Sequence, residues 1–173
     1  MPLPAAKANL DEIIRVNHAG EYGAKRIYQG QLATIRDSKA KAQIEHMLAQ
    51  ELEHLDYFTA EIGKRGVRPT VLQPIWHLGG FALGAVTALM GKHAAMACTV
   101  AVESVIDEHY REQLATLSNE PVLQEKIEKF RAEEVEHHDL GLAEGAEEAP
   151  AYPLLTAAIR GITQTAIALS KKI

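Results

Sequence analysis

Apolar side chains recur along most of this chain at steps of three and four residues, which is the period of an amphipathic α-helix. In one stretch, Ile44, Met47, Phe58 and Ile62 share a face in this way. The sequence shows no persuasive alternation of apolar and polar residues, so strands are not expected. Ser38 is expected to cap one helix, and Ser118 or Asn119 another. The pattern predicts six helices, over about 9–37, 38–66, 74–91, 92–117, 120–145 and 153–173.

The length and composition are typical of a single domain with its own core. The chain has 173 residues and no evident linker, so residues 1–173 are expected to form one domain. Its 18 basic and 23 acidic side chains give a net charge of −5, which offers no reason to expect a nucleic-acid partner. The single cysteine, Cys98, lies in an apolar run and is expected to be a small buried side chain.

Acidic residues and histidines interrupt the apolar stripes as one half-motif that occurs twice: a lone Glu, then Glu-x-x-His about 30 residues later. The six residues are Glu21, Glu51 and His54 in the first half, and Glu103, Glu134 and His137 in the second. Residues three apart on a helix project from one face. This ligand set is typical of ferritin-like bundles that bind two metal ions. The expected fold is therefore all-α: a ferritin-like four-helix bundle made from a duplicated helical hairpin, with two extra apolar helices at about 70–91 and 152–172.

Carboxylate oxygens with one imidazole per metal suit iron or manganese, and zinc would also be tolerated, so spacing alone does not decide the metal. By symmetry, Glu21 and His54 are expected to complete one metal position. Glu103 and His137 would complete the other, and the remaining two glutamates, Glu51 and Glu134, would bridge the pair. Such a set leaves coordination positions open for O₂ or water, as a catalytic site requires.

The neighbouring acids and the other histidines are not expected to bind the metals directly. Four acids fall off the apolar stripes and are expected on a solvated face: Glu53, Asp56, Glu133 and Glu136. His18 lies one turn before Glu21, where it either hydrogen-bonds a ligand or is an ordinary polar residue. The remaining histidines are not expected to be ligands: His46, His77, His93 and His138.

The third and sixth helices are unusually apolar. The 23 residues from Pro69 to Gly91 include no formally charged side chain. A spanning helix there would place the two halves of the motif on opposite sides of a membrane, so it is not expected to span. These helices either lie in a membrane surface, pack on the bundle or form an interface with a second copy of the chain. Ala19, Gly20 and Gly23 leave room beside Glu21 for a bulky apolar substrate, or allow close helix packing.

Several segments carry a family resemblance that covers about residues 13–173. They are RVNHAGEYGA at 15–24, RPT at 68–70, GFALG at 80–84, ACTVAVE at 97–103 and EVEHHD at 134–139. The chain resembles the demethoxyubiquinone hydroxylases, di-iron monooxygenases of ubiquinone biosynthesis. The resemblance implies two iron ions on the six residues named above, and a polyprenyl demethoxyquinone that receives one oxygen atom from O₂.

The resemblance also implies NADH as the electron donor, with His109 and Tyr110 helping electrons to reach the metals. No glycine-rich dinucleotide motif accompanies that expectation. It further implies peripheral attachment to a membrane and, in some members, a lipid-binding partner protein. The N-terminal stretch MPLPAAKANL has no signal or transit character. The expected location is the cytoplasmic face of a bacterial membrane, or the matrix side of the mitochondrial inner membrane for a mature eukaryotic form.

Three other functions compete with this one. An iron-storage bundle would need a polar surface, which the apolar third and sixth helices do not favour. A different di-metal enzyme, peroxidase-like or manganese catalase-like, would be favoured by bound manganese and by peroxide disproportionation without a quinone. A purely structural bundle would have to bury six ionisable side chains without a metal, which is strongly unfavourable.

Overall fold

The protein is built from α-helices, and the described residues contain no strand. This computed structural model describes residues 5–172, so Met1 to Pro4 of the N-terminal stretch and Ile173 of the predicted sixth helix lie outside the described residues. The helices are α1 (Ala5–Thr34), α2 (Ser38–Arg65), α3 (Gln73–Leu89), α4 (Lys92–Leu114), α5 (Pro121–Ala143) and α6 (Tyr152–Lys172). A short 3₁₀ helix, η1 (Ala146–Glu148), was not predicted.

The helix ends differ slightly from those that the sequence predicted. Asp37, not Ser38, is the N-cap of α2, and its carboxylate accepts a hydrogen bond of 2.8 Å from the Ala40 backbone. Either residue could cap, but a carboxylate also gains from the helix dipole. Neither Ser118 nor Asn119 caps α5; the N-cap is Glu120, without a side-chain hydrogen bond, and the helix begins at Pro121.

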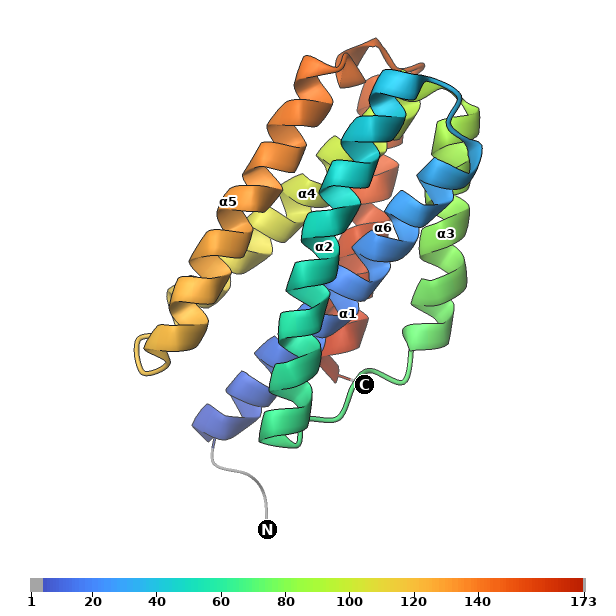
Figure 1. Cartoon of the computed structure of the whole chain (residues 1–173). Coiled ribbons are helices and arrows are strands. Elements are labelled where there is room, and N and C mark those ends of the chain that lie inside the picture. The colour runs from blue at the N-terminus through green and yellow to red at the C-terminus, as the bar shows by residue number, and fades with distance from the viewer. Residues whose placement is uncertain (1–4, 173) are drawn as a thin grey trace.

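Two helical hairpins, α1–α2 and α4–α5, pack together as a four-helix bundle (Figure 1). Helix α3 crosses from one hairpin to the other and packs along α1, whereas α6 packs against α4 and α1. This arrangement confirms the all-α, ferritin-like expectation, including the two helices beyond the bundle.

Two apolar clusters hold the bundle, one on each side of the Glu-x-x-His segment of α2. Met47 and Ile44, before it in the chain, pack with residues such as Met96. Phe58, after it, packs with residues such as Phe130. The candidate ligand residues therefore lie between two layers of apolar side chains, which fix the helices that carry them.

Helices α1 and α3 approach unusually closely because glycines line their contact. A Cβ atom on Gly84 would fall 1.9 Å from the carbonyl oxygen of Ile27, and one on Gly30 would fall 2.1 Å from that of Phe81. Only glycine fits at this backbone separation. The close contact seats α3 beside the stretch of α1 that carries Glu21.

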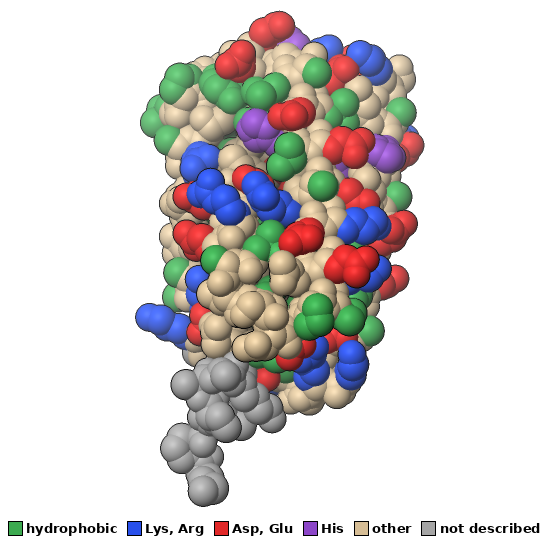
Figure 2. Space-filling model, turned by 90° about the vertical axis from the view of Figure 1, so that its left-hand side faces the viewer, with side chains coloured by type: hydrophobic (Ala, Val, Ile, Leu, Met, Phe, Trp, Pro, Cys, Tyr) green, Lys and Arg blue, Asp and Glu red, His purple; other side chains and the backbone are tan. Residues whose placement is uncertain are grey.

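The outer surface of the bundle is polar where α5 faces solvent. Figure 2 shows acidic and basic side chains interspersed over this side of the molecule. Three of the four acids assigned to a solvated face, Glu53, Asp56 and Glu136, are exposed as predicted. Within residues 5–172, no helix combines the length and the apolar character needed to cross a membrane.

Candidate metal centre

The structure brings the two half-motifs together in the middle of the bundle. Glu21 comes from α1 and Glu103 from α4, while α2 and α5 each supply a Glu-x-x-His pair. All six side chains are at most 3% exposed: Glu21, Glu51, His54, Glu103, Glu134 and His137. Glutamates are almost never buried to this degree unless they are paired or bind a cation.

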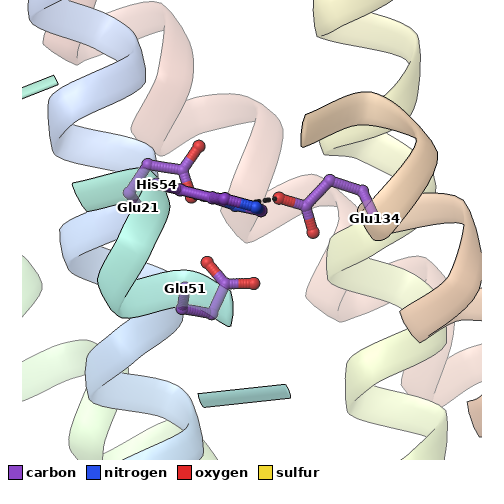
Figure 3. Close-up of side chains that lie close together, drawn as sticks. All are labelled: Glu21, Glu51, His54 and Glu134. Carbon is purple, nitrogen blue, oxygen red and sulfur yellow. Dashed lines mark hydrogen bonds and ion pairs between the residues drawn. The ribbon is translucent and has the colours of Figure 1, made fainter. Parts of the chain in front are cut away.

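The six side chains form two overlapping groups of four. One group contains Glu21, Glu51, His54 and Glu134 (Figure 3), and the other contains Glu51, Glu103, Glu134 and His137. Within each group, one potential ligand atom from every residue lies within 4.8 Å of the others. Glu51 and Glu134 belong to both groups, as two bridging ligands would.

Both imidazoles turn Nδ1 toward the carboxylates. His54 Nδ1 lies 3.1 Å from Glu134 Oε1 and 3.4 Å from Glu21 Oε2. His137 Nδ1 lies 3.2 Å from Glu134 Oε2 and 3.3 Å from Glu51 Oε1. This orientation directs two nitrogen donors and the carboxylate oxygens at the same small volume.

The donor atoms fit a cation better than they fit one another. Among the described residues, both carboxylate oxygens of Glu51, Oε2 of Glu103 and Glu134, and Nδ1 of His137 are buried without a hydrogen-bond partner. Buried polar atoms are normally satisfied, and leaving several unsatisfied in one place is strongly unfavourable. Cations bound between these oxygens and nitrogens would satisfy all of them.

The pKa values of the cluster are shifted because several ionisable groups are buried close together. Burial and the neighbouring Glu134 raise the pKa of Glu51 and of Glu103 well above the usual range. Burial would also raise the pKa of Glu134, but the imidazoles of His137 and His54, whose Nδ1 atoms lie 3.2 and 3.1 Å from its oxygens, outweigh burial and lower that pKa. Burial would lower the pKa of His54, but hydrogen bonds to Glu134 and Glu21 raise it to about 12. The four buried carboxylates are therefore a concentration of potential negative charge, which protons or bound cations would neutralise.

The outer nitrogen of each histidine is also held. His54 Nε2 lies 2.8 Å from Glu133 Oε2, and His137 Nε2 donates to Gln50 Oε1 at 2.8 Å. The expectation that Glu133 lies on a solvated face was wrong, because this side chain is only 19% exposed and is paired with His54. Sequence periodicity did not reveal either contact, since each one joins α2 to α5.

Two tyrosines bind the lone glutamates across the bundle. Tyr110 donates to Glu21, and Tyr28 donates to Glu103. Each tyrosine follows a lone glutamate by seven residues, so the duplicated motif extends to Glu-x₆-Tyr. Tyr110 was predicted as a site residue from the family resemblance, whereas Tyr28 was not, although this repeated spacing could have revealed it. Burial and the nearby carboxylates raise the pKa of both tyrosines, so both stay protonated donors.

His109 stands beside Tyr110 on α4 but faces different surroundings. Its Nε2 lies 2.7 Å from Gln113 Nε2, and Gln113 exchanges two hydrogen bonds with Asn17 at 2.8 and 2.7 Å. Burial lowers the pKa of His109 to about 4, so the imidazole is neutral near pH 7. It also lines a second cavity of about 130 Å³, together with polar residues such as Glu112 and Lys171.

The other histidines do not join the centre. His18 is buried, and its Nδ1 has no hydrogen-bond partner among the described residues; it is not in either ligand group. His77 Nδ1 is 2.6 Å from the Tyr22 hydroxyl. The remaining three are near acids toward the surface: His46 near Glu136, His93 near Glu148 and His138 near Asp139.

An apolar cavity of about 310 Å³ lies beside the cluster, between α1, α3, α4 and α6. Its lining includes Gly20 and Val102, the residues that directly precede the lone glutamates Glu21 and Glu103. The small residues of α1 that were expected to leave room, Ala19, Gly20 and Gly23, all line this cavity. Close packing of α3 uses Gly30 and Gly84, and also Gly80, where a Cβ would lie 3.0 Å from the carbonyl oxygen of Gly23.

The fold and this site define a class: a ferritin-like helical bundle whose buried glutamate and histidine side chains could hold metal ions, with an apolar cavity next to them. Residues 8–170 match the model of a family described as ubiquinone biosynthesis protein COQ7. The chain belongs to this family, and the resemblance expected from its motifs is confirmed.

Curated relatives extend over nearly the whole chain. The chain is 49% identical over 172 residues to a 3-demethoxyubiquinol 3-hydroxylase of Rhodospirillum rubrum, covering 98% of this chain and 81% of the relative. A human mitochondrial relative, named NADPH-dependent 3-demethoxyubiquinone 3-hydroxylase, is 50% identical over 173 residues, with 97% and 80% covered. A yeast (Saccharomyces cerevisiae) mitochondrial 5-demethoxyubiquinone hydroxylase is 38% identical over 187 residues, with 98% and 80% covered. The human relative is named for NADPH, whereas NADH was expected.

Proposed function

We propose that this chain is a di-iron monooxygenase that adds one oxygen atom from O₂ to the ring of a demethoxyubiquinol, as one domain over residues 1–173. The observation that carries the proposal is the position of the buried six-residue cluster beside an apolar cavity. The hydroxylase names of relatives that are about half identical to this chain give the substrate class.

In this proposal Glu21 and His54 bind one iron ion, Glu103 and His137 bind the other, and Glu51 and Glu134 bridge them. The two overlapping ligand groups support that division, and the oxygen-rich donor set suits iron. Two iron ions bound there would supply the redox chemistry that activates O₂. Tyr110 and Tyr28 hold the lone carboxylates in place by donating to Glu21 and Glu103.

The apolar cavity binds the quinol ring and the start of its polyprenyl tail. Its size is within the range of small-molecule sites, and its walls are almost entirely apolar, with residues such as Ile27, Leu83 and Ile106. Such walls exclude water from the reacting ring and hold it near the lone glutamates. Trp76 donates to the Ser170 hydroxyl at 3.0 Å, which ties α3 to α6 beside the cavity.

Exposed apolar side chains on α3 and α6 support attachment to a membrane surface. Leu78 on α3 is 72% exposed and Leu154 on α6 is 74% exposed. Further exposed side chains on these helices are Ile75, Val86, Leu89, Ile162 and Leu169. Because the cavity lies between the same two helices, a polyprenyl quinol could enter it directly from the lipid. The membrane would be a bacterial cytoplasmic membrane or, for a eukaryotic form, the mitochondrial inner membrane.

His109 and Tyr110 are proposed to help electrons from a reduced nicotinamide nucleotide reach the metals. Tyr110 touches Glu21, and the adjacent His109 lines the polar second cavity, so the pair connects that cavity to the cluster. The human relative's name favours NADPH as the donor in that protein, and we carry a nicotinamide donor over to this chain.

A single-turnover assay tests the proposed reaction. Iron-loaded protein in nanodiscs would be chemically reduced, mixed with demethoxyquinol and ¹⁸O₂, and the quinone analysed by mass spectrometry. We expect one labelled oxygen in the product, absent from Glu103→Ala and retained in the surface control Glu136→Ala. Unchanged quinone together with normal iron oxidation would contradict a hydroxylase and favour an iron-storage bundle.

A further inference from the structure

The residues that hold the two histidines from outside occupy equivalent positions in the two hairpins. Gln50 directly precedes Glu51, and Glu133 directly precedes Glu134. Each binds the histidine of the opposite hairpin: Gln50 Oε1 lies 2.8 Å from His137 Nε2, and Glu133 Oε2 lies 2.8 Å from His54 Nε2. The geometry is the same on both sides, and only the chemical group differs, an amide on one side and a carboxylate on the other.

Each contact fixes which ring nitrogen faces the cluster. Because the oxygens of Gln50 and Glu133 accept from Nε2–H, Nδ1 is the ring nitrogen that faces the carboxylates of the cluster and is left to bind a metal ion. Hydrogen bonds to an ionised acceptor are roughly twice as strong as those between neutral groups. A carboxylate acceptor therefore makes His54 a more basic ligand than His137, and adds negative charge near one metal position only.

The tyrosine contacts are matched on the two sides, so they do not offset this difference. Each lone glutamate accepts a hydrogen bond from one tyrosine. Lys129 contacts Glu133 at 3.2 Å, but its side chain is 50% exposed, so solvent and salt screen its opposing charge.

Resting on the proposed metal centre, we propose that Glu133 is a positioning residue that makes the Glu21–His54 position the tighter of the two metal positions. Divalent ions then fill the centre in order, first beside His54 and second beside His137. Gln50 gives the second position its weaker binding.

Cobalt(II) titration of the metal-free full chain tests this order, with NMR detection of the two histidine Nε2–H protons. Replacing each outer acceptor identifies its own histidine signal. At one equivalent of cobalt(II) we expect the His54 signal to show the paramagnetic shift predominantly. In Glu133→Gln, the affinity of the first step should fall about 10–100-fold and both signals should shift.

The matched variant from the other hairpin is Gln50→Glu, and the exchange Gln50→Glu with Glu133→Gln should make the His137 signal shift first. Circular dichroism confirms folding of each variant. Equal occupancy at one equivalent in the parent protein, or an order that the exchange leaves unchanged, would overturn the assignment while leaving the metal centre intact. No cobalt binding in the parent would overturn the metal centre and this assignment together.

Discussion

The hairpins α1–α2 and α4–α5 carry the same ligand pattern but differ at an equivalent position that lines a cavity. Six residues after the lone glutamate, the first hairpin has Ile27, which lines the apolar cavity. The second hairpin has His109 at that place, and it lines the smaller polar cavity. The duplicated positions that would contact metal ions have the same chemistry in both hairpins, whereas these two cavity-lining positions differ.

Glu51 and Glu134 belong to both ligand groups, so a change at either residue should affect both proposed metal positions. Replacing Glu134 by Ala removes a residue that belongs to both ligand groups. We expect loss of both iron ions and a fall in hydroxylation of about a thousandfold or more, which corresponds to about 4 kcal/mol. Metal content per chain, measured by mass spectrometry, checks the result. Full metal content in Glu134→Ala would contradict the bridging role.

Helix α3 packs closely against α1 of the first hairpin, and Gly84 makes this close contact possible. In Gly84→Ala, the new Cβ would lie 1.9 Å from the Ile27 carbonyl oxygen, so α3 must move away. We expect the free energy of unfolding to fall by about 1–3 kcal/mol. Gly79→Ala on the same helix is the control, because its Cβ would meet no atom within 4 Å. Urea unfolding checks the pair, and equal stability of the two variants would contradict the close contact.

Tyr28 and Tyr110 make equivalent contacts in the two hairpins, but only Tyr110 has a proposed role in electron transfer. Tyr28→Phe and Tyr110→Phe each leave a buried carboxylate without its hydroxyl donor. Each should lower the free energy of unfolding by about 1–2 kcal/mol. Turnover driven by a nicotinamide nucleotide should fall further in Tyr110→Phe, because only Tyr110 adjoins His109. Denaturation and steady-state turnover measure the two effects. Equal losses of turnover would argue against separate roles for the halves.

The smallest expected difference concerns Lys129, which pairs with Glu133 near the surface. Its side chain is 50% exposed, so the Lys129–Glu133 pair is strongly screened. In Lys129→Gln we expect the free energy of unfolding to change by less than about 0.5 kcal/mol, and the change to shrink as salt increases. Thermal unfolding at two salt concentrations measures it. A larger loss that salt does not affect would show that Lys129 holds Glu133 in place.

Local spacing in the sequence was sufficient to predict the helices and the six clustered side chains. Glu-x-x-His places both groups on one helical face, and burial of those faces follows from the apolar residues around them. Because a tyrosine follows each lone glutamate by seven residues, the same spacing that places Tyr110 near the site would also have identified Tyr28.

Contacts between hairpins could not be predicted in this way. The position of Glu133 off the apolar stripe suggested a solvated side chain, but His54 reaches it from α2. Which helix faces which, and at what height, is set by packing of whole helices rather than by the period of any one of them. The Gln50–His137 contact and the cavity between four helices have the same origin.

Anomalous diffraction from crystals of the iron-loaded protein tests the central claim most directly. We predict two iron peaks in the bundle, one beside Glu21 and His54 and one beside Glu103 and His137, with Glu51 and Glu134 bound to both. A single peak, or two peaks that share neither glutamate, would contradict a centre built from two equivalent half-sites.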